Sequence, residues 1–214
     1  MDKKTLIKCI GDALELDYEF ISTGTGSVFL RLKGEGFEQS IVFSYRKYPG
    51  VCVLADYLYG WKALDPIEKI LRRYYNKYNL GFQHTTIHVQ TRWKSELSKI
   101  EIQQESDITK AIPYLREMVY EDILPFFEKY QTVEQVYKEM ESLEKSKIAN
   151  FIFHPPTIRM MIIKRLVNDP KWEEFAFGVI NNYKKWSEEP NGAAYKPFAQ
   201  FLPELFKELK EMEV

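Results

Sequence analysis

The chain has 214 residues, and its 30 Lys and Arg nearly balance its 31 Asp and Glu, giving a formal net charge of -1. This length fits one large domain or two small ones. A hydrophobic fraction of 45%, with 14 Phe, 14 Tyr and 4 Trp, is enough for a packed core and excludes a disordered chain. With 10 Gly and 10 Pro, collagen-like and linker-rich classes are excluded too.

Cysteine content and the N-terminus bear on the cellular compartment. Two cysteines cannot make a disulfide scaffold, and a Cys9–Cys52 bridge is not expected in a reducing cytosol. Lys8, Asp12 and Glu15 interrupt the first apolar stretch before it reaches the length of a signal peptide. No run of apolar residues approaches the 18 or so that a membrane helix needs. We therefore expect a cytoplasmic protein that does not enter a membrane.

The first third of the chain changes from helical to strand periodicity. Residues 2–17 place apolar side chains at helical spacing, which predicts an opening amphipathic helix. A turn-rich stretch follows at 22–27. Alternation then predicts strands at 28–33, 41–46 and 51–59, with a hairpin turn at 34–37 and a second turn at Pro49-Gly50. This order predicts an antiparallel meander.

The next segments return to helical signals. Asp65-Pro66 predicts a helix start with Asp65 as the capping carboxylate, and Gly81 is the expected left-handed cap at the end of that helix. A strand is expected at 84–91 and a further short one at 99–103.

From Ser106 onward the pattern is helical. A capping box at Thr132 and Gln135 begins one helix, and Thr157 and Asp169-Pro170 begin two more. Pro113, Pro125, Pro197 and Pro203 are expected to kink or start helices.

These elements predict an α+β fold: an N-terminal helix, an antiparallel sheet of four to five strands with an inserted helix, and an all-helical C-terminal portion. The paired prolines in residues 151–156 favour an extended connector. We therefore expect a sheet domain at 1–146 and a helical extension at 147–214. The alternative is one continuous domain in which all the helices pack on one sheet.

Catalytic and cofactor motifs are not found in the sequence. Residues 24–27 lack the lysine of a phosphate-binding loop, and there is no Gly-x-Ser-x-Gly elbow. On a strand, His84 and His88 would lie about 13 Å apart and could not share one zinc ion. Cys9 and Cys52 fall within apolar patterns typical of core residues. The sequence predicts no catalytic, cofactor or metal site; a hydrolase site assembled from distant residues is a minority alternative.

The neutral total conceals a basic segment. Residues 69–94 contain six cations and no acid, for a charge of +6. Cations interleaved with aromatic rings are typical of single-stranded nucleic-acid binding. The candidate residues are Arg72, Arg73, Lys77, Arg92, Trp93 and Lys94. The alternative is structural: Tyr74 and Tyr78 share the apolar stripe of their helix, which leaves the cations as a solvated surface, and a pI near 6.4 is low for a nucleic-acid binder.

An acidic segment provides the opposite charge. Residues 117–144 contain eight acids against two lysines, for a charge of -6. Such helices are commonly soluble surface, but an acidic face can also dock on a basic partner protein. The candidate partner-binding residues are Glu139, Glu141 and Glu144.

Residues 122–130 read Asp-Ile-Leu-Pro-Phe-Phe-Glu-Lys-Tyr and are followed by Thr132-Val133-Glu134. With the opening helix and the meander, this segment makes residues 1–140 resemble a broad bacterial family described only as a domain of unknown function. The resemblance implies an immunity or partner-binding protein, and it supplies no catalytic residues. Phe126 and Phe127 are expected to anchor the core beneath a kink at Pro125. Because core-forming patterns are abundant and catalytic motifs are missing, the leading hypothesis is a bacterial protein-binding module without catalytic chemistry.

Overall fold

The structure is a computed structural model that describes residues 2–24, 26–33 and 37–213. Contacts divide the chain into two compact units, and each unit is built from two separate segments. Unit 1 comprises Met1–Ala63 and Ile87–Gln131, and unit 2 comprises Leu64–Thr86 and Thr132–Val214. These bounds differ from the expected division at residue 146, because the helix that begins at Asp65 groups with the C-terminal helices.

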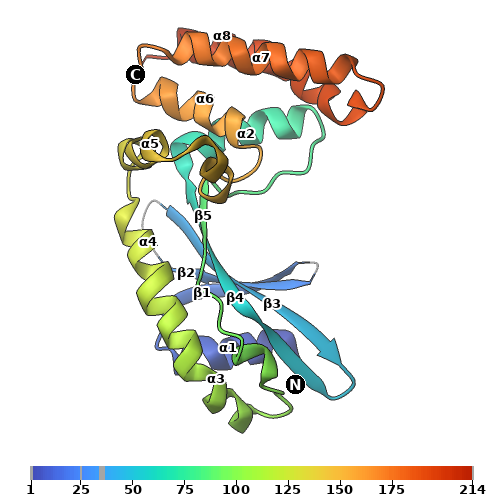
Figure 1. The fold of residues 1–214 in the computed structure, drawn as a ribbon, viewed down its shortest axis with the longest axis vertical. Coiled ribbons are helices and arrows are strands. Elements are labelled where there is room, and N and C mark those ends of the chain that lie inside the picture. The colour runs from blue at the N-terminus through green and yellow to red at the C-terminus, as the bar shows by residue number, and fades with distance from the viewer. Residues whose placement is uncertain (1, 25, 34–36, 214) are drawn as a thin grey trace. The chain divides into compact units, whose positions relative to one another are not determined.

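Unit 1 contains a five-stranded antiparallel sheet in the order β1-β2-β3-β4-β5, which confirms the α+β class and the meander (Figure 1). Strand β4 ends one residue beyond the unit boundary. The strands are β1 Tyr18–Gly24, β2 Ser27–Leu32, β3 Phe37–Tyr48, β4 Val51–Leu64 and β5 Ile87–Gln90.

Three strand predictions need correction. Strand β1 was missed, because apolar Phe20 and Ile21 point to opposite faces of the sheet and conceal its alternation. The strand expected at 84–91 begins only at Ile87. The strand expected at 99–103 is a single bridge between Ile102 and Cys52.

The turn at Pro49-Gly50 is confirmed, with Gly50 at a φ of 76°. The turn expected at 34–37 lies largely outside the described residues, as does Thr25 within the stretch at 22–27.

Helices cover one face of this sheet. Helix α1 (Lys3–Ala13) begins at Asp2, whose carboxylate accepts from the backbone N–H of Thr5 at 3.0 Å. Its Leu6, Ile7 and Ile10 join one buried cluster with residues of β2, β3, β4 and the helices that follow β5. That cluster is the core of unit 1.

The second helical element of unit 1 is a continuous rod, yellow-green in Figure 1. It consists of α3 (Glu105–Glu117), the π-helical turn η2 (Met118–Ile123) and α4 (Leu124–Lys129). Pro113 lies inside α3 and so does not start a helix, whereas Pro125 lies in the first turn of α4, directly after the π-helical turn. Proline has no N–H and its ring crowds the preceding turn, so a π-helical turn before Pro125 accommodates both effects. Phe127 is a core residue as expected, while Phe126 is only partly buried.

A lysine lies inside unit 1. The side chain of Lys62 is fully buried, and its Nζ donates to the backbone carbonyl of Phe127 at 2.7 Å. Burial lowers the pKa of Lys62 to about 8. The carbonyl of Phe127 lies in the last turn of α4, where backbone carbonyls have no N–H partner within the helix. The Lys62 ammonium therefore supplies a hydrogen-bond donor to the end of this helix.

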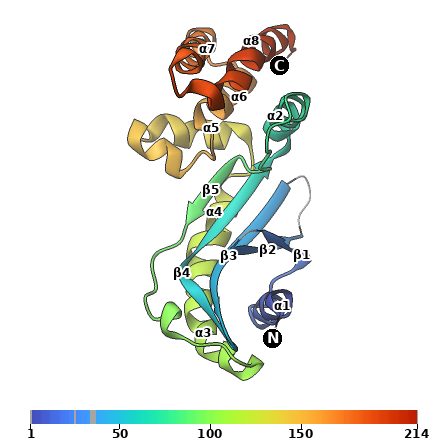
Figure 2. The same ribbon diagram turned by 90° about the vertical axis from the view of Figure 1, so that its right-hand side faces the viewer.

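Unit 2 is helical, and Figure 2 shows α7 and α8 lying along each other. Its elements are α2 Asp65–Lys77, α5 Val133–Ser142, η3 Lys145–Asn150, α6 Pro156–Leu166, α7 Trp172–Glu188, η4 Gly192–Tyr195 and α8 Lys196–Glu211. The Thr132–Gln135 capping box is confirmed. Helix α6 begins at Pro156, next to the predicted Thr157, and α7 begins at Trp172, after Asp169-Pro170.

Three helices end with a non-glycine residue in the left-handed conformation. Glu15, Asn79 and Asn168 have φ of 55°, 51° and 54° after α1, α2 and α6. After α2, the N–H of Leu80 bonds to the carbonyl of Tyr75, which is the Schellman pattern. The predicted cap at Gly81 is therefore wrong, and so is Asp65 as N-cap, because that position belongs to Leu64.

Unit 2 has a charged pair in its interior. Arg159 and Glu68 are 1% and 0% exposed. The hydroxyl of Thr86 donates to Glu68 at 2.8 Å, and Arg159 also donates to the carbonyls of Gln83 and His154 at 3.0 and 2.7 Å. The pair is fully hydrogen-bonded, as a buried ion pair has to be.

In the described parts of both units, no helix combines the length and apolarity that a membrane crossing requires.

Candidate functional site

The outer face of the unit 1 sheet is the candidate site. Residues directly opposite each other on neighbouring strands share a face. Trp61 is opposite His88, Tyr59 is opposite Gln90, and Phe29 is opposite Val42. None of these residues belongs to the core cluster that the helices cover. They form the side of the sheet opposite that cluster.

Aromatic side chains on this face contact one another across several strands. Phe29 of β2 lies 5.1 Å from Trp61 of β4 between ring centroids, and Tyr57 lies 5.3 Å from Tyr59 in an edge-to-face arrangement. Trp93, just beyond β5, lies 4.9 Å from Tyr57. We call these residues the aromatic face: Phe29, Tyr57, Tyr59, Trp61, His88 and Trp93.

Trp93 is the most exposed member of the aromatic face, at 65%. The other members are half-buried. Burial, with a smaller effect of Tyr57, raises the pKa of Tyr59, so its phenol is protonated at neutral pH. The surface therefore combines flat apolar rings with hydroxyl groups that can donate hydrogen bonds.

Two of the predicted nucleic-acid residues flank Trp93, and both are paired with acids. The guanidinium of Arg92 lies 3.1 Å from Asp122 and 2.9 Å from Glu121. Lys94 forms an ion pair with Glu117. The acidic segment therefore neutralises this end of the basic segment within unit 1.

The other predicted cations belong to unit 2. Lys77 lies 2.6 Å from Glu204, Arg73 forms an ion pair with Glu208, and Arg72 contacts His84. Residues 69–94 are thus divided between the two units. Lys69 pairs with Asp65 at 2.8 Å, so five of the six cations in this segment have a carboxylate partner among the described residues. Tyr74 is buried, as the structural alternative expected.

The acidic candidates lie on or just after α5 in unit 2. Glu141 pairs with Lys164 at 2.7 Å, and Lys164 also pairs with Asp169 at 2.7 Å. Glu144 is exposed and lies 3.5 Å from Lys147, and Glu139 is half-buried. The three residues therefore differ in environment, and Glu141 has an internal structural contact.

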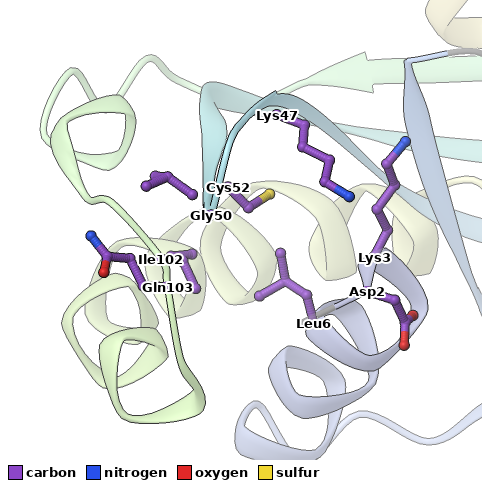
Figure 3. Close-up of a pocket in the computed structure, with 9 residues that line it drawn as sticks. Asp2, Lys3, Leu6, Lys47, Gly50, Cys52, Ile102 and Gln103 are labelled. Atoms are coloured by element: carbon purple, nitrogen blue, oxygen red, sulfur yellow. The ribbon is translucent and has the colours of Figure 1, made fainter.

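A small pocket in unit 1 tests the hydrolase alternative (Figure 3). It has a volume of about 180 Å³ and lies between the β3–β4 hairpin and α1, with Lys3, Lys47 and Cys52 among its lining residues. Burial raises the pKa of the Cys52 thiol, which lowers the fraction of nucleophilic thiolate at neutral pH. The pocket is lined by no histidine that could act as a base. Both cysteines are free thiols.

His84 and His88 lie in different units. His84 is in an extended segment of unit 2 and His88 is on β5 of unit 1, so the expected common strand is wrong. Among the described residues, no group of three or more His, Cys, Asp or Glu side chains has the placement to hold a metal ion.

No protein-family model, curated protein or solved structure matches the chain. The resemblance of residues 1–140 to the uncharacterised bacterial family stays a prediction.

Sequence reasoning found Trp93 but not the rest of the aromatic face. Tyr57, Tyr59 and Trp61 follow the period of two that predicts a strand, and that period also places them on one face. The alternation alone does not show which face of the strand the helices cover, because that depends on tertiary packing.

Proposed function

We propose that the chain is a cytoplasmic binding protein without catalytic chemistry, and that it recognises another protein through the aromatic face of unit 1. The observation that carries the proposal is two groups of ring contacts, Phe29–Trp61 and Tyr59–Tyr57–Trp93, on the side of the sheet away from the core cluster. Tyr and Trp are enriched at the centres of protein interfaces, where charged residues are depleted.

Charge favours a protein partner over a nucleic acid. A nucleic-acid strand needs cations that are available to its phosphates. Beside the aromatic face, Arg92 and Lys94 are held by Asp122, Glu121 and Glu117. A phosphate would have to displace these carboxylates, whereas an apolar protein surface would leave the ion pairs intact at the rim. The partner is therefore expected to present apolar side chains with few charges.

The test is a binding comparison with matched variants. A protein captured from the source cell would be identified, purified and titrated calorimetrically against the wild type, Trp93→Ala and Phe177→Ala. Phe177 is also an exposed aromatic, at 50%, but belongs to unit 2. The proposal expects a stoichiometric complex that Trp93→Ala weakens at least tenfold and Phe177→Ala leaves unchanged. Equal affinity of all three proteins would overturn it.

Two further arms separate the alternatives. Binding of a labelled oligothymidylate at low salt that is lost in Trp93→Ala would assign the aromatic face to nucleic acid instead. Weakening by Glu139→Lys and Glu144→Lys, with no effect of Trp93→Ala, would move the interface to the acidic residues. Glu141 is left out of this arm because its substitution would also break the contact with Lys164.

A further inference from the structure

Unit 2 contains a second candidate site, a cavity between its helices. It has a volume of about 360 Å³, within the range of roughly 300–1,000 Å³ typical of small-molecule sites. Its lining comes from α2, from the segment after α2, from His154 and Pro155 just before α6, and from α6, α7, η4 and α8, and all of these lie in unit 2. The cavity is independent of the aromatic face of unit 1.

Four aromatic side chains form a continuous wall. Phe198 lies 6.0 Å from Tyr75 and 5.4 Å from Tyr183 between ring centroids, and Tyr183 lies 6.0 Å from Tyr195. The Tyr75–Phe198 and Tyr183–Tyr195 pairs are edge-to-face. Such a wall offers ring edges and faces to a flat guest.

One polar atom in this wall has no protein partner. Tyr75 is 5% exposed, and its hydroxyl makes no hydrogen bond with any described residue. Buried hydroxyl groups are nearly always hydrogen-bonded, so this one requires an explanation. Burial raises the pKa of Tyr75 well above its usual value, so the group stays a phenol that can both donate and accept.

The permanent charge in the lining, that of Arg159, is already neutralised; the other residue there that can become positively charged is His154. Arg159 is part of the lining, but its guanidinium donates to Glu68, Gln83 and His154. The guanidinium N–H groups that could bind a carboxylate or phosphate in a bidentate manner are therefore already used within the protein. A ligand carrying a full charge would therefore lose hydration without gaining an ion pair with Arg159.

We infer that this cavity binds a small, neutral, planar molecule whose single polar group forms a hydrogen bond with the Tyr75 hydroxyl. The aromatic wall accounts for the planar shape, the neutralised Arg159 for the absence of charge, and the unpaired hydroxyl for the polar group. The inference does not depend on the proposed interface of unit 1.

The test uses the full chain and four one-ring or two-ring probes. Indole and phenol are the neutral probes, and benzoate and benzylamine are charged probes of similar size. Ligand-observed NMR titration is expected to show millimolar or tighter binding of a neutral probe and at least fivefold weaker binding of both charged probes. The Tyr75→Phe variant is expected to bind the neutral probe about fivefold more weakly than the wild type. Its melting temperature should equal or exceed that of the wild type, because the substitution removes an unpaired buried hydroxyl.

Two controls make the test specific. Tyr78→Phe removes a hydroxyl that is bonded to Glu204 outside the cavity, and it should leave the affinity unchanged. Ala194→Trp places a large ring on an exposed lining residue, and it should abolish binding without unfolding unit 2. The inference is overturned if no neutral probe binds, if benzoate binds as tightly as indole, or if Tyr75→Phe binds like the wild type.

Discussion

The guanidinium of Arg159 lies side by side with the carboxylate of Glu68, with Nε 2.8 Å from Oε1 and Nη2 2.9 Å from Oε2. This two-pronged geometry is the strongest form of the Arg–carboxylate pair. The residues are 91 positions apart, so the pair joins the segment 64–86 to the C-terminal helices within unit 2.

Breaking this pair is expected to destabilise unit 2. Arg159→Met leaves the Glu68 carboxylate buried without its cation, and such changes cost about 3–5 kcal/mol. Removing both charges in Glu68→Gln/Arg159→Met should recover a large part of this loss, as measured by urea unfolding. Lys69→Met, which removes an exposed pair with Asp65, serves as the control and should change stability by less than about 0.5 kcal/mol. A double variant no more stable than Arg159→Met would contradict the expectation.

The buried lysine of unit 1 predicts a dependence of stability on pH. The pKa of Lys62 is about 8 in the fold and near 10.4 in an unfolded chain. Between these values the unfolded state binds more protons, so raising the pH from 8 to 10 should increase the free energy of unfolding, by about 2 kcal/mol. Lys62→Met should lack this increase. Parallel urea titrations of both proteins at each pH would measure the difference, and identical pH profiles would refute the assignment.

The left-handed residue after α1 offers a stabilising substitution. Glu15 has a φ of 55°, which costs a residue with a Cβ roughly 1–2 kcal/mol relative to glycine. Glu15→Gly should raise the free energy of unfolding by about 0.5–1 kcal/mol, the net of relieved strain and a more flexible unfolded chain. Glu15→Ala keeps the Cβ and is expected to gain nothing. If both variants have the melting temperature of the wild type, this residue carries no strain.

The ion pair between α2 and α8 is expected to be weak. Lys77 and Glu204 are 59% and 45% exposed, and exposed pairs contribute about 0.2–1 kcal/mol. A double-mutant cycle with Lys77→Ala and Glu204→Ala should give a coupling energy in this range, and the coupling should shrink in 1 M salt. A coupling above 2 kcal/mol that is insensitive to salt would show that the pair is shielded from solvent.

Local signals in the sequence predicted most of the elements but not how they group. Capping residues and alternation identified α1, β2, β3, β4 and the Thr132 helix start, because these features depend on neighbours within a few positions. The two left-handed asparagines were missed, since glycine is the usual residue there. The grouping of α2 with the C-terminal helices depends on contacts such as Glu68–Arg159, and no local pattern encodes a partner 91 positions away.

The candidate sites show the same limit. Both charged segments were visible in the sequence, but their mutual neutralisation around Arg92 depends on the fold. The unpaired hydroxyl of Tyr75 was equally hidden, because a pattern of apolar spacing says which side chains are buried and not whether their polar atoms find partners.

The discontinuous units have a consequence for how the protein can be taken apart. The chain passes between them three times, at residues 63–64, 86–87 and 131–132. One backbone cut at any of these passages leaves two other covalent connections. Limited proteolysis would therefore need cuts at all three passages to release either unit, and no simple truncation of either end yields an intact unit. Separating them genetically requires joining residue 63 to 87 for unit 1 and residue 86 to 132 for unit 2.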